Sequence, residues 1–232
     1  MKTTALIMAA GRGRRLGDET PKQFHRLMDK PLLNYCLEAF EYMPEIDSMI
    51  VVLPPEYAQM VQVRMDLKHF QKIVDIVAGG DRRQDSVWNG LKAIPEITEY
   101  VLIHDGVRPF PPIRETRKAL EVAREFGAAI LALPITDTVK VGGQDDNIQM
   151  TLDRSNLWAA QTPQIFRKKL LLEGYQKGQR ENKTFTDDAA AVENLGYPVR
   201  LAPGSPYNIK ITQVEDLNLA AGIFQSRKED LD

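Results

Sequence analysis

One stretch near the N-terminus constrains the fold more than any other. An apolar run from Thr4 to Met8 is followed at once by two small residues, two glycines one residue apart and three arginines. Glycine tolerates backbone conformations that other residues avoid, so Gly11 and Gly13 allow a sharp turn whose N–H groups approach an anion. The pattern therefore predicts a buried strand that ends in a phosphate-binding loop.

Positive charge gathers on the same stretch. Arg12, Arg14, Arg15 and Lys22 place four cations within eleven residues, in a chain whose formal net charge is only −2. Two glycines alone would fit equally well a tight strand-to-helix turn with solvated arginines. The added cations favour an anion site, and their number matches the charge of a triphosphate.

Two better-known glycine-rich loops do not fit this stretch. The dinucleotide-binding fingerprint, Gly-x-Gly-x-x-Gly, requires glycine at position 16, where the chain has Leu16. The P-loop requires Gly-Lys-Ser/Thr after four residues, and Gly11 is followed instead by Arg-Gly-Arg-Arg-Leu. A dinucleotide oxidoreductase is disfavoured further because Leu53 and Pro54 end the second expected strand, where an acidic residue would bind ribose.

Composition narrows the class of protein. With 232 residues and 43% hydrophobic content, the chain can form one large α/β domain or two small ones, and we expect one domain over residues 1–232. Its 30 basic and 32 acidic residues nearly cancel, which argues against nucleic acid or a membrane as partner. The five apolar residues near the N-terminus are too few for a signal peptide or a membrane span, so we expect a cytoplasmic protein.

Cysteine and histidine give no sign of a metal site. The lone cysteine, Cys36, lies in an apolar helical pattern that favours a packed thiol over a nucleophile. His25, His69 and His104 are far apart in the sequence and lack metal-ligand spacing.

Apolar runs alternate with helical patterns along most of the chain. The expected strands after the first are 49–53, 73–77, 100–104 and 129–133, and the expected helices begin near 31, 56, 86 and 113. This order predicts an α/β fold with an open, mostly parallel, twisted sheet and helices on both faces. Ligands of such sheets bind beyond the carboxyl ends of the strands, so we expect the turns 9–17, 79–86 and 105–108 to share one crevice.

The pattern changes after Pro134. Residues 135–141 and 148–152 indicate two short alternating strands around a polar turn, and we expect a protruding β-hairpin arm over 135–152. A two-stranded hairpin is marginally stable alone in water, so it needs a packing surface, and another subunit is one candidate. The remaining expected elements are helices at 167–176 and 187–195, a strand at 199–201 and a last helix from about 215.

A set of short motifs occurs in one order along residues 4 to 220. The motifs are Ala9-Ala-Gly-Arg-Gly-Arg-Arg-Leu16, Pro21-Lys-Gln23, Gly79-Gly-Asp-Arg82 with Asp85-Ser86, His104-Asp-Gly-Val-Arg-Pro109, Asp137-Thr138, Asp153-Arg154, Gln161-Thr-Pro-Gln164, Thr186-Asp187 and Asn208-Ile-Lys-Ile-Thr212. Together they resemble the 2-C-methyl-D-erythritol 4-phosphate cytidylyltransferase family of the non-mevalonate isoprenoid route. The set is specific, although no single motif is, and the resemblance implies a Rossmann-like nucleotidyltransferase fold.

The resemblance implies a reaction between CTP and a polyol phosphate. A phosphate oxygen of the substrate would attack the α-phosphorus of CTP and expel pyrophosphate, and since the phosphate is already ionised near neutrality no general base is required. Arg15 and Lys22 match the family's transition-state cations, with Mg²⁺ bridging the triphosphate oxygens. Lys210 and Arg154 match the residues that orient the substrate phosphate. For an isolated lysine or arginine, a solvated surface role would be the ordinary interpretation.

The resemblance also implies which residues bind the nucleotide. Cytosine would be bound by Ala9, Ala10 and Gly11 on one side and by Gly80, Asp81 and Ser86 on the other. Gly13 and Arg14 would lie near the phosphates. The alternative for Asp81 and Ser86 is capping of the following helix.

The polyol side is implied by a further set of matching positions. These positions are Asp105, Arg108, Thr138, Thr162, Thr186 and Asp187. Asp105 could also serve Mg²⁺ through a water molecule. In the family the arm reaches over a second subunit, so we expect a homodimer in which Thr138 and Arg154 enter the neighbour's pocket.

Two alternatives stay open at this point. Cytidylyltransferases that make CDP-ribitol share most of these motifs, although Asp153-Arg-Ser-Asn-Leu-Trp158 and Thr184-Phe-Thr-Asp-Asp-Ala189 are closer to the methylerythritol pattern. A non-catalytic nucleotide-binding module on the same fold is the other, since fold alone does not fix function. The four cations Arg15, Lys22, Arg154 and Lys210 argue against it, because a pure binder has no need of transition-state charges.

Overall fold

The computed structural model describes residues 1–11 and 20–229. The strands are β1 (Thr3–Met8), β2 (Arg26–Leu27), β3 (Lys30–Pro31), β4 (Ser48–Leu53), β5 (Ile73–Ala78), β6 (Tyr100–Asp105), β7 (Ala128–Pro134), β8 (Lys140–Gly142), β9 (Ile148–Thr151), β10 (Trp158–Arg167) and β11 (Arg200–Pro203). The α-helices are α1 (Leu32–Glu41), α2 (Pro55–Ala58), α3 (Val61–Leu67), α4 (Arg83–Ala93), α5 (Ile113–Phe126), α6 (Lys168–Arg180), α7 (Asp188–Glu193) and α8 (Val214–Glu229). Short 3-10 turns are η2 (Lys22–Phe24), η3 (Gln144–Asp146) and η4 (Arg154–Asn156).

Across the described residues, the main sheet has seven strands in the order β11-β7-β10-β6-β1-β4-β5. β1 lies between β6 and β4 and is parallel to both, with Leu6 beside Ile50 on one side and Ile103 on the other. β10 is antiparallel to its neighbours β6 and β7. The expected open, mostly parallel sheet is confirmed.

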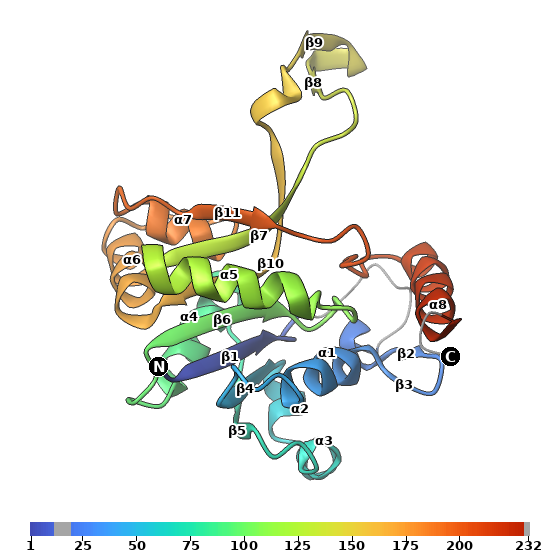
Figure 1. Ribbon diagram of the computed structural model, residues 1–232, viewed down its shortest axis with the longest axis vertical. Coiled ribbons are helices and arrows are strands. Elements are labelled where there is room, and N and C mark those ends of the chain that lie inside the picture. The colour runs from blue at the N-terminus through green and yellow to red at the C-terminus, as the bar shows by residue number, and fades with distance from the viewer. Residues whose placement is uncertain (12–19, 230–232) are drawn as a thin grey trace.

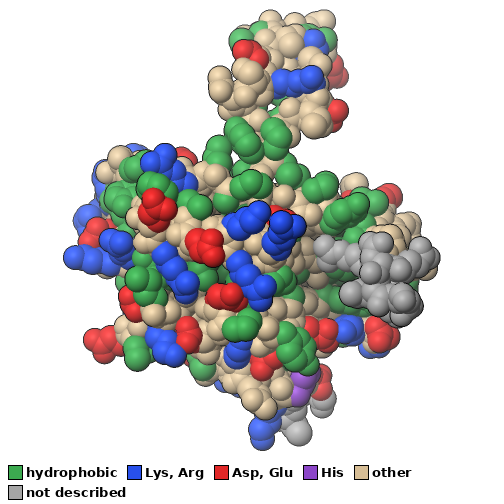
Figure 2. All heavy atoms as spheres, viewed as in Figure 1, with side chains coloured by type: hydrophobic (Ala, Val, Ile, Leu, Met, Phe, Trp, Pro, Cys, Tyr) green, Lys and Arg blue, Asp and Glu red, His purple; other side chains and the backbone are tan. Residues whose placement is uncertain are grey.

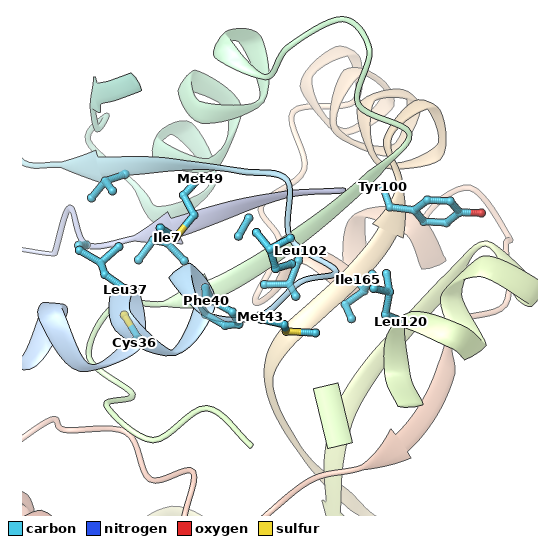
Figure 3. Close-up of a cluster of buried hydrophobic side chains, with 14 of the residues drawn as sticks. Ile7, Cys36, Leu37, Phe40, Met43, Met49, Tyr100, Leu102, Leu120 and Ile165 are labelled. Carbon is cyan, nitrogen blue, oxygen red and sulfur yellow. The ribbon is translucent and has the colours of Figure 1, made fainter. Parts of the chain in front are cut away.

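Alternate residues of each strand contact helices on opposite faces of the sheet. Ala5 and Ile7 of β1 belong to a cluster with α1 and α5, whereas Leu6 and Met8 belong to a cluster with α4, α6 and α7. In Figure 3 the side chains of α1, including Phe40, lie against the face of the sheet that carries Ala5 and Ile7. Helices therefore cover both faces, as the continuous apolar runs predict for strands buried on both sides.

Cys36 has the structural role expected of it. The side chain is fully buried on α1 and its Sγ donates to the carbonyl of Leu33 at 3.1 Å. Burial raises the pKa of the thiol, so it stays protonated and packs as a small apolar group.

The longest strand, β10, is absent from the sequence prediction. Pro163 interrupts it, and a proline inside an apolar run argues against a strand because it has no N–H to donate. In the structure the pairing with β7 shifts register between Ala160 and Gln164, so the proline lies where the ladder is already irregular. The helix expected from 56 is also divided, into α2 and α3.

The arm stands clear of the rest of the molecule in Figures 1 and 2. Its two strands are shorter than expected, because the first begins at Lys140 rather than near 135. Ile148 and Met150 of β9 have 65% and 51% of their surface exposed. The protomer therefore leaves these two apolar side chains of the arm largely exposed, and their burial against another subunit stays a prediction.

Two surface properties bear on partners. On the face seen in Figure 2, basic and acidic side chains of the body are interspersed rather than separated into patches. Every helix in the described part of the chain is too short or too polar to cross a bilayer.

Candidate active site

The carboxyl ends of β1, β5 and β6 open onto a pocket with a volume of about 870 Å³. Met8, the last residue of β1, lies in register with Asp105, the last residue of β6. The pocket is lined by Met8, Ala9, Ala10, Gly11, Lys22, Gln23, Pro55, Gly79, Gly80, Asp81, Arg82, Arg83, Ser86, Asp105, Val107, Lys210 and Thr212. The three turns expected to share one crevice thus meet, within the described residues, in a cavity large enough for a nucleotide.

One side of the pocket is built from tightly packed small residues. Gly79 donates its N–H to the carbonyl of Leu53 at 2.8 Å, and a Cβ at this position would come within 2.4 Å of the Ala10 Cβ. A Cβ on Gly80 would come within 2.6 Å of the Asp85 Cβ. Only glycine allows the turn after β5 to approach the turn after β1 this closely.

Hydrogen bonds fix most of the N–H groups on this side. Ala9 donates its N–H to the carbonyl of Val52, and Gly80 donates to Ser86 Oγ at 3.0 Å. Ser86 Oγ in turn donates to the carbonyl of Arg82 at 3.1 Å. Within the described residues, the groups left to bind a ligand on this side are therefore mainly carbonyl oxygens and the backbone of Ala10 and Gly11.

The structure decides against helix capping by Asp81 or Ser86. Arg82 occupies the N-cap of α4, and the Asp85 carboxylate accepts its N–H at 3.2 Å. Asp81 is exposed at the pocket rim, and Ser86 lies inside the first turn of the helix.

The opposite side of the pocket contains a carboxylate surrounded by three cations. Asp105 is buried, and its Oδ2 lies 2.8 Å from Lys210 Nζ and 3.8 Å from Arg108 Nε. Its Oδ1 lies 3.7 Å from Arg83 Nη2. Burial alone would raise the pKa of Asp105, but Lys210, Arg83 and Arg108 outweigh it and hold that pKa at about 2. The group is therefore a carboxylate at any physiological pH, with cationic charge in excess around it.

His104 supports this cluster from inside the protein. The ring is fully buried, its Nε2 lies 3.1 Å from the carbonyl of Arg108, and its Nδ1 lies 3.2 Å from Thr162 Oγ1. A carbonyl only accepts, so Nε2 carries the proton and the Thr162 hydroxyl donates to Nδ1. Thr162 Oγ1 also accepts the N–H of Asp105 at 3.0 Å. Burial lowers the pKa of His104 to about 4, so the neutral ring holds both ends of the turn 105–108.

Several residues expected on the polyol side lie outside the pocket lining. Thr162 is buried with its hydroxyl engaged as above. Asp187 caps α7, since its Oδ1 accepts from Ala190 N and its Oδ2 accepts from Gln164 Nε2. Thr186 is exposed beside it. Substrate contacts by these residues stay predictions.

The arm residues are separate from this pocket within the protomer. Thr138 and Arg154 are both exposed, and the Arg154 guanidinium donates to the carbonyl of Thr136 at the base of the arm. Three further predicted residues, Gly13, Arg14 and Arg15, lie outside the described residues.

Several residues of the pocket lining were not among the predicted site residues, and two of them, Arg83 and Gln23, are polar residues with notable surroundings. Arg83 lies on the helical stripe shared by the buried residues Ser86, Val87 and Gly90, whereas Arg82 falls beside that stripe. The helical spacing could therefore have distinguished the two arginines. Gln23, next to Lys22, is fully buried, and its amide has no hydrogen-bond partner within the described part of the chain.

Among the described residues, the donor set does not fit a metal ion held by side chains alone. The described His, Cys, Asp and Glu residues form no group of three that could ligate one. Asp105, the expected ligand through water, already faces three cations at 2.8 to 3.8 Å. A divalent ion in this pocket would depend on phosphate oxygens and water for its coordination.

Comparison with known proteins identifies the family. A family model described as 2-C-methyl-D-erythritol 4-phosphate cytidylyltransferase matches residues 3–226. The chain belongs to this family. A protein of Syntrophus aciditrophicus with that same name is 44% identical over 98% of this chain and 97% of its own length.

Solved structures of the family have the same fold. The 4-diphosphocytidyl-2C-methyl-D-erythritol synthase of Anaerococcus prevotii superposes with a TM-score of 0.84 at 31% identity, over 97% of this chain and 96% of that one. The 2-C-methyl-D-erythritol 4-phosphate cytidylyltransferase of Thermus thermophilus gives 0.80 at 32% identity, over 96% and 98%. The resemblance inferred from the motifs and the fold class are thereby confirmed.

Proposed function

We propose that the pocket transfers CMP from CTP to 2-C-methyl-D-erythritol 4-phosphate, giving 4-diphosphocytidyl-2-C-methyl-D-erythritol and pyrophosphate. The observation that carries the proposal is the division of one cavity into a glycine-lined side and a cationic side. Close-packed backbone around Ala10 and Gly80 suits a flat base, and Lys22 and Lys210 suit phosphates. Membership of the family supplies the nucleotide and the polyol.

The reaction forms one P–O bond and breaks another. A phosphate oxygen of the polyol attacks the α-phosphorus of CTP, and the bond to the β-phosphate oxygen breaks as pyrophosphate leaves. Lys22 neutralises charge that develops on the triphosphate, together with Arg15 as the motif implies, and Lys210 holds the polyol phosphate. Since Lys210 Nζ lies 2.8 Å from Asp105, binding of the phosphate makes the amine share or exchange that partner.

Magnesium stays a prediction. Because the described residues offer few ligands, the ion would accompany the triphosphate, where Mg²⁺ ordinarily binds phosphate oxygens and retains several waters. The cytoplasmic location expected from the sequence is likewise a prediction.

Assembly as a homodimer is part of the proposal, and we treat residues 1–232 as one domain with the arm as its dimerisation element. The exposed side chains of Ile148 and Met150 support a second subunit as the covering surface. The position of Thr138 and Arg154 away from their own pocket supports their action in the neighbour's.

The test is incubation with CTP, Mg²⁺ and one of four phosphates, those of methylerythritol, ribitol, erythritol and glycerol, with pyrophosphate as readout. We expect turnover with methylerythritol phosphate to exceed that with the others. Faster turnover with ribitol 5-phosphate would assign the chain to CDP-ribitol synthesis, and no pyrophosphate with any of them would indicate a binding module.

The same assay tests the choice of nucleotide, and we expect a higher kcat/KM with CTP than with UTP. Protein carbonyl groups that accept a hydrogen bond from the cytosine amine would face a uracil carbonyl instead and would be left without a donor.

A further inference from the structure

Arg83 lies between two carboxylates from different parts of the chain. Its guanidinium makes a two-pronged contact with Asp188 of α7, with Nη1 to Oδ1 at 3.1 Å and Nη2 to Oδ2 at 2.6 Å. The same Nη2 lies 3.7 Å from Asp105 Oδ1 in the pocket. One side chain of α4 thus joins the pocket to the helices on one face of the sheet.

The contact with Asp188 fixes the guanidinium in place. Asp188 is fully buried, and its Oδ1 also accepts the hydroxyl of Tyr175 at 2.6 Å. The N–H of Asp188 donates to Gln164 Oε1 at 3.1 Å, which ties its backbone to β10. A planar guanidinium held by two parallel hydrogen bonds to a buried carboxylate cannot rotate without breaking both. Burial would lower the pKa of Arg83, but Asp188 and Asp105 more than reverse this, so the charge is permanent.

Arg83 therefore gives Asp105 an asymmetric environment. Arg83 faces Oδ1 of Asp105, while Lys210 and Arg108 face its Oδ2. Without a cation beside Oδ1, the carboxylate could turn toward the cations on the other side, and the Lys210 amine would move with it. The orientation of the carboxylate thus depends on a residue that need not touch either substrate.

We propose that Arg83, held by Asp188 and Tyr175, is a positioning residue that orients Asp105 and, through it, Lys210 toward the polyol phosphate. The inference rests on the proposed function, because Lys210 binds that phosphate there. A purely structural role for the ion pair would link α4 to α7 and leave substrate binding unaffected when the fold survives.

Two variants separate these roles. Arg83→Lys keeps the charge but loses the two-pronged contact, and Tyr175→Phe removes one hydrogen bond to Asp188 while changing no residue of the pocket lining. We expect Arg83→Lys to raise the KM for methylerythritol phosphate about tenfold, as small misplacements of a binding group do, with the KM for CTP changed less than about twofold. Tyr175→Phe should raise the same KM by a smaller factor, again leaving that for CTP unchanged.

Matched controls come from contacts remote from the pocket. Arg117→Lys alters an ion pair in which Arg117 Nε lies 2.9 Å from Glu45 Oε1. Tyr197→Phe removes the hydrogen bond that the Tyr197 hydroxyl donates to the carbonyl of Phe126. Both controls should retain wild-type KM values for both substrates. The thermal midpoint of every variant is measured alongside.

The outcomes are distinct. A selective increase in the KM for the polyol phosphate in folded Arg83→Lys, or in Tyr175→Phe if Arg83→Lys does not fold, supports the positioning role. Wild-type KM values in folded Arg83→Lys overturn it; if that variant does not fold, wild-type KM values in Tyr175→Phe do so. A wild-type protein that turns over no polyol phosphate overturns the proposed function itself, whereas an active wild type with unaffected variants overturns only this inference.

Discussion

Asp105 and Arg154 were both expected in the site, and they lie in opposite surroundings. Asp105 is buried at the end of a central strand, with its side chain beside three cations and its backbone N–H bonded to Thr162. Arg154 is exposed at the base of the arm, where its guanidinium donates a hydrogen bond to the carbonyl of Thr136 on the same arm. The comparison indicates that the geometry of the described pocket is determined within a protomer, whereas the arm lies apart from that pocket and, in the proposed dimer, acts on the partner subunit. Changes in the body should therefore act within one chain, and changes in the arm between chains.

The largest effect is expected for His104, deep in the body. Burial lowers its pKa to about 4 from an ordinary value of 6.5, so the unfolded chain binds a proton in this window that the folded protein does not. Stability is therefore lost as pH falls from 6.5 toward 4, by about 3 kcal/mol from this group. Denaturant unfolding at about pH 7, 5.5 and 4.5 should show this loss in the wild type and less of it in His104→Gln. Identical pH slopes in the two proteins would mean that His104 is not held neutral.

Lys22 tests whether the pocket contributes to chemistry rather than to folding. The residue lies on the pocket surface in the short turn η2, so Lys22→Ala should leave the thermal midpoint nearly unchanged. We expect kcat to fall by about 10²-fold, the scale on which one preorganised donor acts. Steady-state assays with saturating CTP measure it, and retention of more than half the wild-type kcat would remove Lys22 from the mechanism.

Mixing two inactive variants tests the arm directly. If sites are composite, a heterodimer of Lys22→Ala and Arg154→Ala has one pocket with Lys22 from one chain and Arg154 from the other. Random reassortment makes about half of the dimers heterodimers with one good site, so activity should recover toward about a quarter of wild type. Each variant incubated alone is the control. Absence of recovery despite demonstrated subunit exchange would place Arg154 in its own protomer's site.

The smallest effect on the fold is expected at the tip of the arm. Ile148 is 65% exposed, so Ile148→Ser should change the stability of the protomer by no more than about 0.5 kcal/mol. The same change should weaken self-association, which sedimentation over a range of concentrations measures. Val74→Ser, at a residue 55% exposed on β5, is the matched control and should leave association intact. A wild type that is monomeric at micromolar concentration would exclude the dimer.

The parts predicted well from the sequence are those that depend on local pattern. A strand buried on both faces gives a continuous apolar run, and a close approach of backbone needs glycine, so β1 and the turn at Gly79 and Gly80 were found. The convergence of those turns followed from a general property of parallel sheets.

The parts that were missed depend on partners distant in sequence. β10 was hidden by Pro163, because the irregular pairing that accommodates a proline is set by β7, not by neighbouring residues. Arg83 was overlooked because its main partner, Asp188, is 105 residues away. The capping of α7 by the Asp187 carboxylate was likewise not foreseen, and its contact with substrate stays a prediction.

The position of β10 has a consequence for the order in which the chain is completed during synthesis. β1, β4, β5 and β6 all precede residue 106, so they can pair with one another before the rest of the chain is made. Both sheet neighbours of β7, which are β10 and β11, come later in the chain than β7 itself. A growing chain that has passed residue 134 therefore carries a finished apolar strand whose neighbours have yet to be translated, and the whole arm is made before β10 joins the two halves of the sheet.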